Sequence, residues 1–183
     1  MKFRIITAML LATALLGTTA GFAQAPAEPP PAAPANPLDT VPEKMPFSQP
    51  YGAPIALARA QALVQAAIAE ATKHGWAMNI AVVDSGANLV AFGRMDAAQL
   101  ASISISEHKA RTAAKFRRPT KVFEGGIQGG NNYMLSLDDV VASRGGIPLI
   151  EDGKLIGGIG CSGGTGSQDE VVCTAALNAL NSK

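Results

Sequence analysis

The order of the predicted elements indicates an α+β fold: a central antiparallel β-sheet of about five strands with helices packed on its faces. Two hairpin patterns, each made of two short apolar strands around a glycine-containing turn, lie at 78–92 and 147–161. Segments with a helical spacing of apolar residues flank both hairpins. The strand–helix–strand spacing of a parallel sheet is absent, so we expect the strands to pair as hairpins.

The first 23 residues have the order of a secretory signal peptide. Lys2 and Arg4 form a charged start, an uncharged apolar run spans 5–19, and Gly21 and Ala23 supply small residues before a cut after Ala23. A retained membrane anchor is the alternative, but the run is shorter than the roughly 20 apolar residues of a span. We expect a periplasmic or secreted protein without a transmembrane segment in the mature chain.

Residues 24–50 hold nine of the twelve prolines. This composition favours extended polyproline conformations and does not form a hydrophobic core. The sequence therefore predicts three parts: a signal peptide at 1–23, a proline-rich tether at 24–50 and one domain at 51–183.

The first helix of the domain is expected over 55–73, where apolar residues recur at helical spacing. Gly75 is a suitable end for it, because glycine readily adopts the left-handed conformation of a helix C-cap. The strands of the first hairpin are expected at 78–83 and 89–92, with a turn at 85–88.

Asp96 is expected to begin the second helix, with Gln99 three residues on as in a capping box. Pro119 ends that helix near Arg117, because proline cannot continue it. Within the following segment, 120–146, four glycines between 125 and 130 mark a loop, and a short helix is expected within 132–143.

The second hairpin is expected to have strands at 147–150 and 155–161, joined by a turn at 151–153. Ser167 then begins the last helix, with Glu170 completing a Ser-x-x-Glu capping box. This helix is expected to end near Asn181.

The charge pattern does not favour nucleic acid as a partner. The formal net charge is +1, and few aromatic residues accompany the cations. Six cations lie within thirteen residues. They could bind carboxylates or a polyanion, or they could form the solvated face of a helix. They are Lys109, Arg111, Lys115, Arg117, Arg118 and Lys121.

The segment 158–163 matches the pattern G-x-G-x-x-G. A dinucleotide site would need a following strand–helix–strand unit, and only 20 residues remain after Gly163, so we reject it. Two interpretations stay open: a cradle for an anionic group such as a propionate or phosphate, and a tight turn where glycine relieves crowding.

His108 lies inside the second predicted helix, on a partly apolar face. It is a candidate axial ligand of haem iron or else a core or interface residue. Met95 is a candidate soft iron ligand or a core filler, and Asp96 a site residue or a helix cap. Cys161 and Cys173 could pair in an oxidising compartment, but their separation in space is not evident from sequence.

Several segments in order resemble the GlcG/HbpS-like family. They are VVDSGANLVAFGRMD at 82–96, KARTAAKF at 109–116, RPT at 118–120, GGIPL at 145–149, DGKLIGGIGCSG at 152–163 and DE at 169–170. The resemblance spans roughly 55–182. One departure is Ala97, where the family stretch RMDGA has glycine.

The resemblance implies an antiparallel sheet with helices on its faces, homo-oligomeric assembly and haem binding, with slow haem breakdown or iron binding in some members. Fold transfers between relatives better than activity does. The candidate cofactor-binding residues are His108, Thr112, Arg94, Met95, Asp96, Gly146, Ser162 and Gly163, with His108 as the candidate metal ligand.

Three functions follow as hypotheses. The first is an exported haem- or tetrapyrrole-binding protein in which propionates meet backbone amides or the basic helix. The second is a small-molecule enzyme or sensor in which Arg94 clamps the carboxylate of an organic acid. The third is a structural or interaction protein without a ligand. No motif for nucleophilic catalysis is present.

Overall fold

A computed structural model of the chain describes residues 40–45 and 49–181. The chain divides into two units, 1–42 and 43–183, and all the helices and strands described below belong to the second. The predicted signal peptide and most of the predicted tether lie outside the described residues. Within those residues, no helix is long and apolar enough to cross a membrane.

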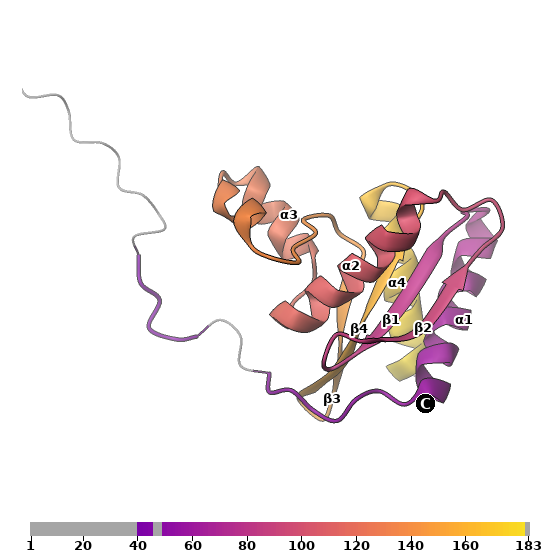
Figure 1. Cartoon of the computed structure of the whole chain (residues 1–183), viewed down its shortest axis with the longest axis horizontal. Coiled ribbons are helices and arrows are strands. Elements are labelled where there is room, and N and C mark those ends of the chain that lie inside the picture. Colours follow the sequence, from indigo (N-terminus) through magenta and orange to yellow (C-terminus); the bar gives the residue numbers. More distant parts are fainter. Residues whose placement is uncertain (1–39, 46–48, 182–183) are drawn as a thin grey trace, which may run out of the picture. The chain divides into compact units, whose positions relative to one another are not determined.

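The fold is α+β, as predicted, with a sheet of four strands rather than about five (Figure 1). The strand order is β2-β1-β4-β3, and every neighbouring pair is antiparallel. The strands are β1 (Asn79–Asp84), β2 (Leu89–Arg94), β3 (Gly146–Glu151) and β4 (Lys154–Ser162). Both predicted hairpins are confirmed, β1–β2 and β3–β4, so β2 and β3 are the edge strands.

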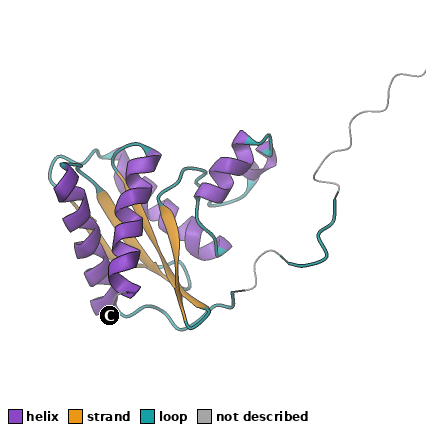
Figure 2. Cartoon of the chain, turned by 180° about the vertical axis from the view of Figure 1, so that it is seen from behind, coloured by secondary structure: helices purple, strands orange, loops and turns teal. Residues whose placement is uncertain are grey.

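Helices cover the two faces of the sheet unequally. Helix α2 (Ala101–Phe116) lies across one face, over β4, β1 and β3. Helices α1 (Leu57–His74) and α4 (Gly166–Asn181) pack side by side on the other face, as Figure 2 shows. The larger apolar cluster fills the space under α1 and α4, and a smaller one, including Ala81, Val83 and Ala110, lies under α2.

The glycines of the G-x-G-x-x-G segment let α2 lie close to the sheet. Gly158 and Gly160 are inside β4, not in a turn after it. A Cβ atom built on Gly158 would lie 2.4 Å from the Ala110 carbonyl oxygen, and one on Gly160 would lie 2.1 Å from that of Ser106. The structure therefore supports the crowding interpretation, with the crowding between a strand and the helix above it.

The second helix begins later than predicted. Asp96 and Ala97 form a turn in which the Ala98 N–H donates to the Met95 carbonyl, and α2 starts at Ala101 without a side-chain cap. The predicted Asp96 capping box is wrong because the chain needs this turn to pass from the end of β2 to the helix on the sheet face. The predicted end near Arg117 is confirmed.

The segment 120–146 is more helical than expected. Gly125 and Gly126 lie inside α3 (Lys121–Gln128), not in a loop. A short 3-10 helix, η2 (Asn132–Ser136), follows and packs against α3, since Met134 occupies the space beside Gly126. The prediction failed because glycine leaves room for the Met134 side chain, a gain that overrides its weak helix propensity.

The last helix has a different cap from the predicted one. Thr165 and Gln168 form the reciprocal pair: the Gln168 side chain accepts from the Thr165 N–H at 2.8 Å, and the Thr165 hydroxyl accepts from the Gln168 N–H at 3.4 Å. Glu170 instead forms ion pairs with Lys121 and Arg144. The predicted Ser167–Glu170 capping box is therefore wrong by two residues.

Two links outside the sheet hold the domain together. Cys161 of β4 and Cys173 of α4 form a disulfide with a Cα–Cα distance of 5.7 Å, which settles the question that the sequence left open. At the other end of β4, the Leu155 N–H donates to the Pro50 carbonyl and the Gly52 N–H donates to the Leu155 carbonyl. The segment just before α1 is thus bonded to the sheet.

Candidate functional site

Four predicted site residues meet at one end of the sheet. Asn79 of β1, which was not predicted as a site residue, lies opposite Arg94 of β2 on one side and opposite Ser162 of β4 on the other. Residues opposite each other on antiparallel strands point to the same face. That face carries α2, because the Ser162 hydroxyl lies 3.0 Å from the Ser102 hydroxyl of that helix. Gly163 follows Ser162, and Gly146 begins β3 at the same end.

The backbone amides at this end already have acceptors. The N–H groups of Gly163 and Gly164 both donate to Oδ1 of Asp169 at 3.1 Å. The Gly146 N–H donates to the Thr120 hydroxyl at 2.9 Å. An anion cradle needs amides that point at the ligand. These three amides do not offer one.

A buried ion pair joins α2 to the start of α4. Lys109 Nζ lies 2.6 Å from Asp169 Oδ2, with side-chain exposures of 1% and 3%. The same ammonium donates to the Cys161 carbonyl at 3.4 Å. In the sequence Lys109 is one cation of a basic run, and no local pattern indicates this pair, because the partner lies 60 residues further along the chain.

The other cations of the basic run also have partners within residues 40–45 and 49–181. The remaining ion pairs join Arg111 with Glu107, Lys115 with Asp139, and Lys121 with Glu170. Arg117 donates to the Gln49 carbonyl and lies over the Tyr51 ring, and Arg118 lies over the rings of Phe116 and Phe123. The run therefore serves contacts within the domain.

Thr112 and His108 lie further along α2. The buried Thr112 hydroxyl donates to the Asp139 carbonyl at 2.5 Å and accepts from the Val141 N–H at 3.0 Å, so it holds the loop before β3. His108 is exposed. The pKa of the Asp139 carboxyl is lowered first by the hydrogen bond from Lys115 and, to a smaller extent, by the charge of His108.

Three exposed residues of β2 lie on the sheet face that carries α2, and we call them the β2 strip: Leu89, Phe92 and Arg94. In register, Phe92 is opposite Ala81, and Leu89 is opposite Val83; both partners belong to the cluster under α2. Leu89 is 45% exposed and Phe92 36%, because α2 lies over the other three strands. The strip is therefore an uncovered apolar edge beside the helix.

Arg94 ends the β2 strip as an exposed cation. Within the described part of the chain, its guanidinium has no ion-pair or hydrogen-bond partner. Its neighbour across the sheet, Asn79, is fully buried and donates to the Gln99 carbonyl, while its Oδ1 has no donor among the described residues. Arg94 can thus take an anionic group without breaking a contact of its own.

Met95 and Asp96 follow directly. Met95 is half-buried against the larger apolar cluster, and its N–H donates to the Met78 carbonyl at 3.0 Å. Asp96 is exposed in the turn before α2. No group of three or more His, Cys, Asp or Glu side chains suited to a metal ion occurs in residues 40–45 and 49–181.

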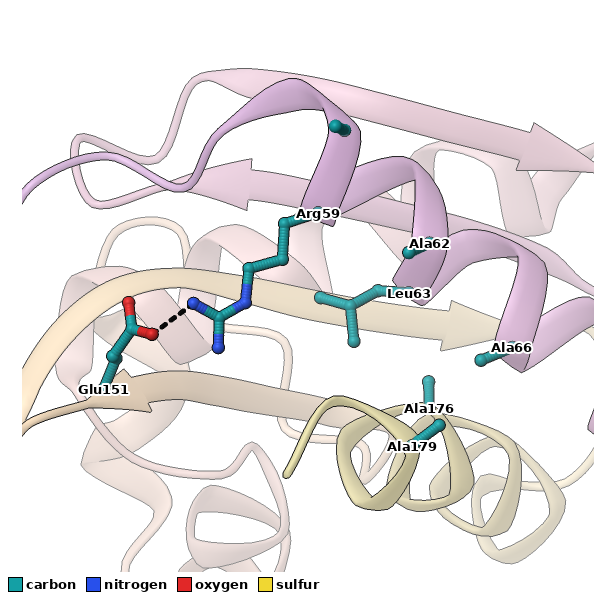
Figure 3. A pocket seen from close by; sticks show the side chains of 8 residues that line it. Arg59, Ala62, Leu63, Ala66, Glu151, Ala176 and Ala179 are labelled. Carbon is teal, nitrogen blue, oxygen red and sulfur yellow. Dashed lines mark hydrogen bonds and ion pairs between the residues drawn. The ribbon is translucent and has the colours of Figure 1, made fainter. Parts of the chain in front are cut away.

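Two cavities formed by the described residues lie away from the predicted site residues. One, of about 460 Å³, lies between α1 and α4 and is lined mainly by alanines, with the Arg59–Glu151 ion pair at its edge (Figure 3). The other, of about 310 Å³, lies between α1 and β2 and includes Val90 and Phe92. None of the predicted site residues lines either cavity. The β2 edge, through Phe92, borders the second.

The comparisons with known proteins define the class of this protein. A family model described as "Haem degrading protein HbpS-like" matches residues 55–178. Protein GlcG of Escherichia coli strain K12 is 40% identical over 103 residues, 56% of this chain and 77% of that protein. The chain belongs to the HbpS-like family, and the resemblance read from its sequence motifs is confirmed.

Solved structures support the same assignment. Protein ORFY of Klebsiella pneumoniae superposes with a TM-score of 0.68 at 32% identity, over 76% of this chain and 99% of that one. PduOC, in a crystal structure of its complex with haem, superposes with a TM-score of 0.65 at 29% identity, over 70% of this chain and 96% of that one.

Proposed function

We propose that this chain is an exported, homo-oligomeric protein that binds haem or another tetrapyrrole. Membership of the HbpS-like family and the likeness to PduOC, which was crystallised with haem, support the proposal. The observation that carries it is the β2 strip, an exposed apolar surface that ends in an unpartnered guanidinium. A porphyrin has the matching chemistry, since it joins an apolar ring to carboxylate side chains.

The residues present fit a haem group in part. The β2 strip suits the ring and a propionate, while the exposed His108 suits the iron, because a neutral imidazole nitrogen is a common axial ligand. When bound, the group would supply an iron centre. His108 lies on α2 and not on the strip. Because the iron of a haem lies at the centre of its ring, His108 and the β2 strip are tested separately.

The test is titration of the purified chain with haemin and, in parallel, with iron-free protoporphyrin. The proposal expects saturable binding of both, with a Soret shift for haemin. Substitution His108→Ala should change the haemin spectrum and leave protoporphyrin binding intact. An unchanged spectrum in the variant would remove only His108 as the ligand, whereas no binding of either porphyrin by the wild type would end the proposal.

Weak haem degradation or iron binding, which the family resemblance implies, stays a prediction. Export to the periplasm or beyond is likewise part of the proposal and is checked by the N-terminal residue of the protein recovered from the producing cell. A mature chain that begins at Gln24 supports it, and a chain that keeps Lys2 and Arg4 contradicts it.

One observation favours a second candidate function, the binding of a small organic acid. The exposed Arg94 guanidinium can hold a carboxylate in a bidentate pair without any ring beside it. A thermal-shift screen against carboxylic acids separates the two functions. A shift that vanishes in Arg94→Ala, together with no porphyrin binding, favours the organic acid.

A further inference from the structure

We infer that Arg94 holds a carboxylate of the bound ligand and that the ligand's ring lies along the β2 strip, at the open side of α2. This inference rests on the proposed function and names the surface that carries it. It replaces both places that the sequence suggested for a propionate, the glycine-rich amides and the basic helix.

Four of the six cations of the basic run already have carboxylate partners, and the other two, Arg117 and Arg118, lie against aromatic rings and donate to backbone carbonyls. Lys109 is buried against Asp169, and Lys115, Arg111 and Lys121 each pair with a carboxylate of the domain. A ligand carboxylate would have to displace one of these partners, and a displaced Asp169 would itself be left buried without a cation. Such an exchange gains little, because one carboxylate only replaces another.

The glycine-rich amides are excluded in the same way. Asp169 already accepts from Gly163 and Gly164, and Thr120 from Gly146. A carboxylate at these amides would stand beside the negative charge of Asp169. Of the predicted site residues at this end of the sheet, Arg94 is the cation that a carboxylate can reach without such a conflict.

The fold holds Arg94 and its apolar neighbours in a fixed relation. Phe92 and Arg94 are two residues apart on one strand and point to the same face, while Gly93 between them packs against Val64 and Ile68 of α1. A Cβ atom on Gly93 would lie 2.6 Å from Val64 Cγ1, so the strand sits directly on that helix. Phe92 therefore lies on the same sheet face as Arg94, two residues or roughly 6–7 Å away along the strand.

The experiment compares haemin with haemin dimethyl ester, in which both propionates are esterified and uncharged. Binding of each to the full chain is measured by titration for the wild type and for the variants Arg94→Gln, Arg94→Lys, Lys154→Gln, Phe92→Ser and Leu135→Ser. Lys154 is an exposed cation at the opposite end of β4, so its variant loses the same charge at a different place. Circular dichroism and a melting curve confirm that each variant is folded.

The inference expects the wild type to prefer haemin over the ester by about tenfold, the size of one charge-assisted contact. Arg94→Gln should lose that preference, Arg94→Lys should keep part of it, and Lys154→Gln should keep all of it. Phe92→Ser should weaken both ligands alike, whereas Leu135→Ser, which alters an exposed apolar residue of η2, should weaken neither.

Failure of the inference and failure of the proposed function give different results. If the wild type binds haemin and Arg94→Gln keeps the full preference, Arg94 is not the anchor although porphyrin binding stands. If the wild type binds neither porphyrin, the proposed function fails. The thermal-shift screen against carboxylic acids then tests whether Arg94 binds a carboxylate. A shift of the wild type that is lost in Arg94→Gln but kept in Lys154→Gln supports Arg94 as a carboxylate site. No shift of the wild type overturns the inference.

Discussion

Ala97 adopts a backbone conformation that its side chain disfavours. Its φ is 61°, in the left-handed region, at the turn between β2 and α2. The stretch RMDGA of the GlcG/HbpS-like family has glycine at this place, and the geometry explains why: glycine has no Cβ atom to clash there. The departure noted in the sequence is therefore a site of local strain and not a change in the ligand surface.

Replacing Ala97 with glycine should stabilise the domain. The relief of the left-handed strain, about 1–2 kcal/mol, exceeds the extra chain entropy of glycine, so we expect a gain of up to about 1 kcal/mol in the free energy of unfolding. Denaturant unfolding measures it. The matched variant Ala98→Gly, at a buried position with no such strain, should instead lose stability; equal effects in both would contradict the explanation.

The buried pair of Lys109 and Asp169 predicts a large cost for removing one partner. Lys109→Met leaves a buried carboxylate with no cation, which typically costs about 3–5 kcal/mol. The exposed pair of Lys115 and Asp139 is the control, and Lys115→Met should cost less than about 1 kcal/mol. Chemical denaturation of both variants checks the contrast. Similar losses would mean that the burial of the first pair does not matter.

At the scale of elements, the close contact between α2 and the sheet depends on glycine. Gly160→Ala would press a methyl group against the Ser106 carbonyl, so we expect a loss of about 3 kcal/mol or failure to fold. Gly125→Ala, inside α3 with nothing within 4 Å of the new Cβ, should be neutral or slightly stabilising. A melting curve for each distinguishes crowding from a general intolerance of alanine for glycine.

The contact between α3 and the segment before β3 should make stability depend on acid pH. The pKa of the Glu124 carboxyl is lowered from its usual 4.5, first by the hydrogen bond from the Arg144 side chain, against the opposing effect of burial. A lowered pKa in the folded state adds stability above the unfolded value, and that stability is lost as the pH falls below about 4.5.

Glu124→Gln should therefore reduce the free energy of unfolding near neutral pH and flatten its decline between pH 5 and about 3. The measurement is denaturant unfolding of both proteins across this range. Parallel curves for the variant and the wild type would show that Glu124 does not contribute to the acid sensitivity. Asp139, whose pKa Lys115 lowers, supplies part of the decline that remains.

Local sequence patterns correctly predicted those elements whose structure depends on residues close together in the chain. Both hairpins, the first helix with its left-handed Gly75 and the end of α2 followed from apolar spacing and turn residues. The start of α2 and the helix α3 did not, because a turn after β2 and the packing of Met134 on Gly126 decide them. Those are contacts that propensity does not encode.

The site was harder to predict for the same physical reason. The motif residues Ser162, Gly163 and Gly146 gather at one end of the sheet, where β4 ends and β3 begins. Thr120 accepts from the Gly146 N–H. Asp169 accepts from the N–H groups of Gly163 and Gly164 and also pairs with Lys109, 60 positions away in the chain. A single sequence gives no sign of that pairing, so only the structure separates Arg94 from the other cations.

Taken as a whole, the domain covers one sheet face with two helices and the other with one. The single helix leaves β2 exposed on its side, and this asymmetry creates the β2 strip. The disulfide between β4 and α4 and the bonds of the pre-helix segment to β4 belong to the covered part of the fold. The contacts around β4 and α4 therefore stabilise the fold, and the exposed edge strand β2 is the place that we propose for ligand binding.

The most direct measurement of this assignment is amide hydrogen exchange of the full chain with and without saturating haemin, read by mass spectrometry. The account predicts that ligand-dependent protection centres on the peptide spanning 89–96 and on the side of α2 beside it. Protection confined to α1 and α4, around the alanine-lined cavity, with no change at 89–96, would contradict it.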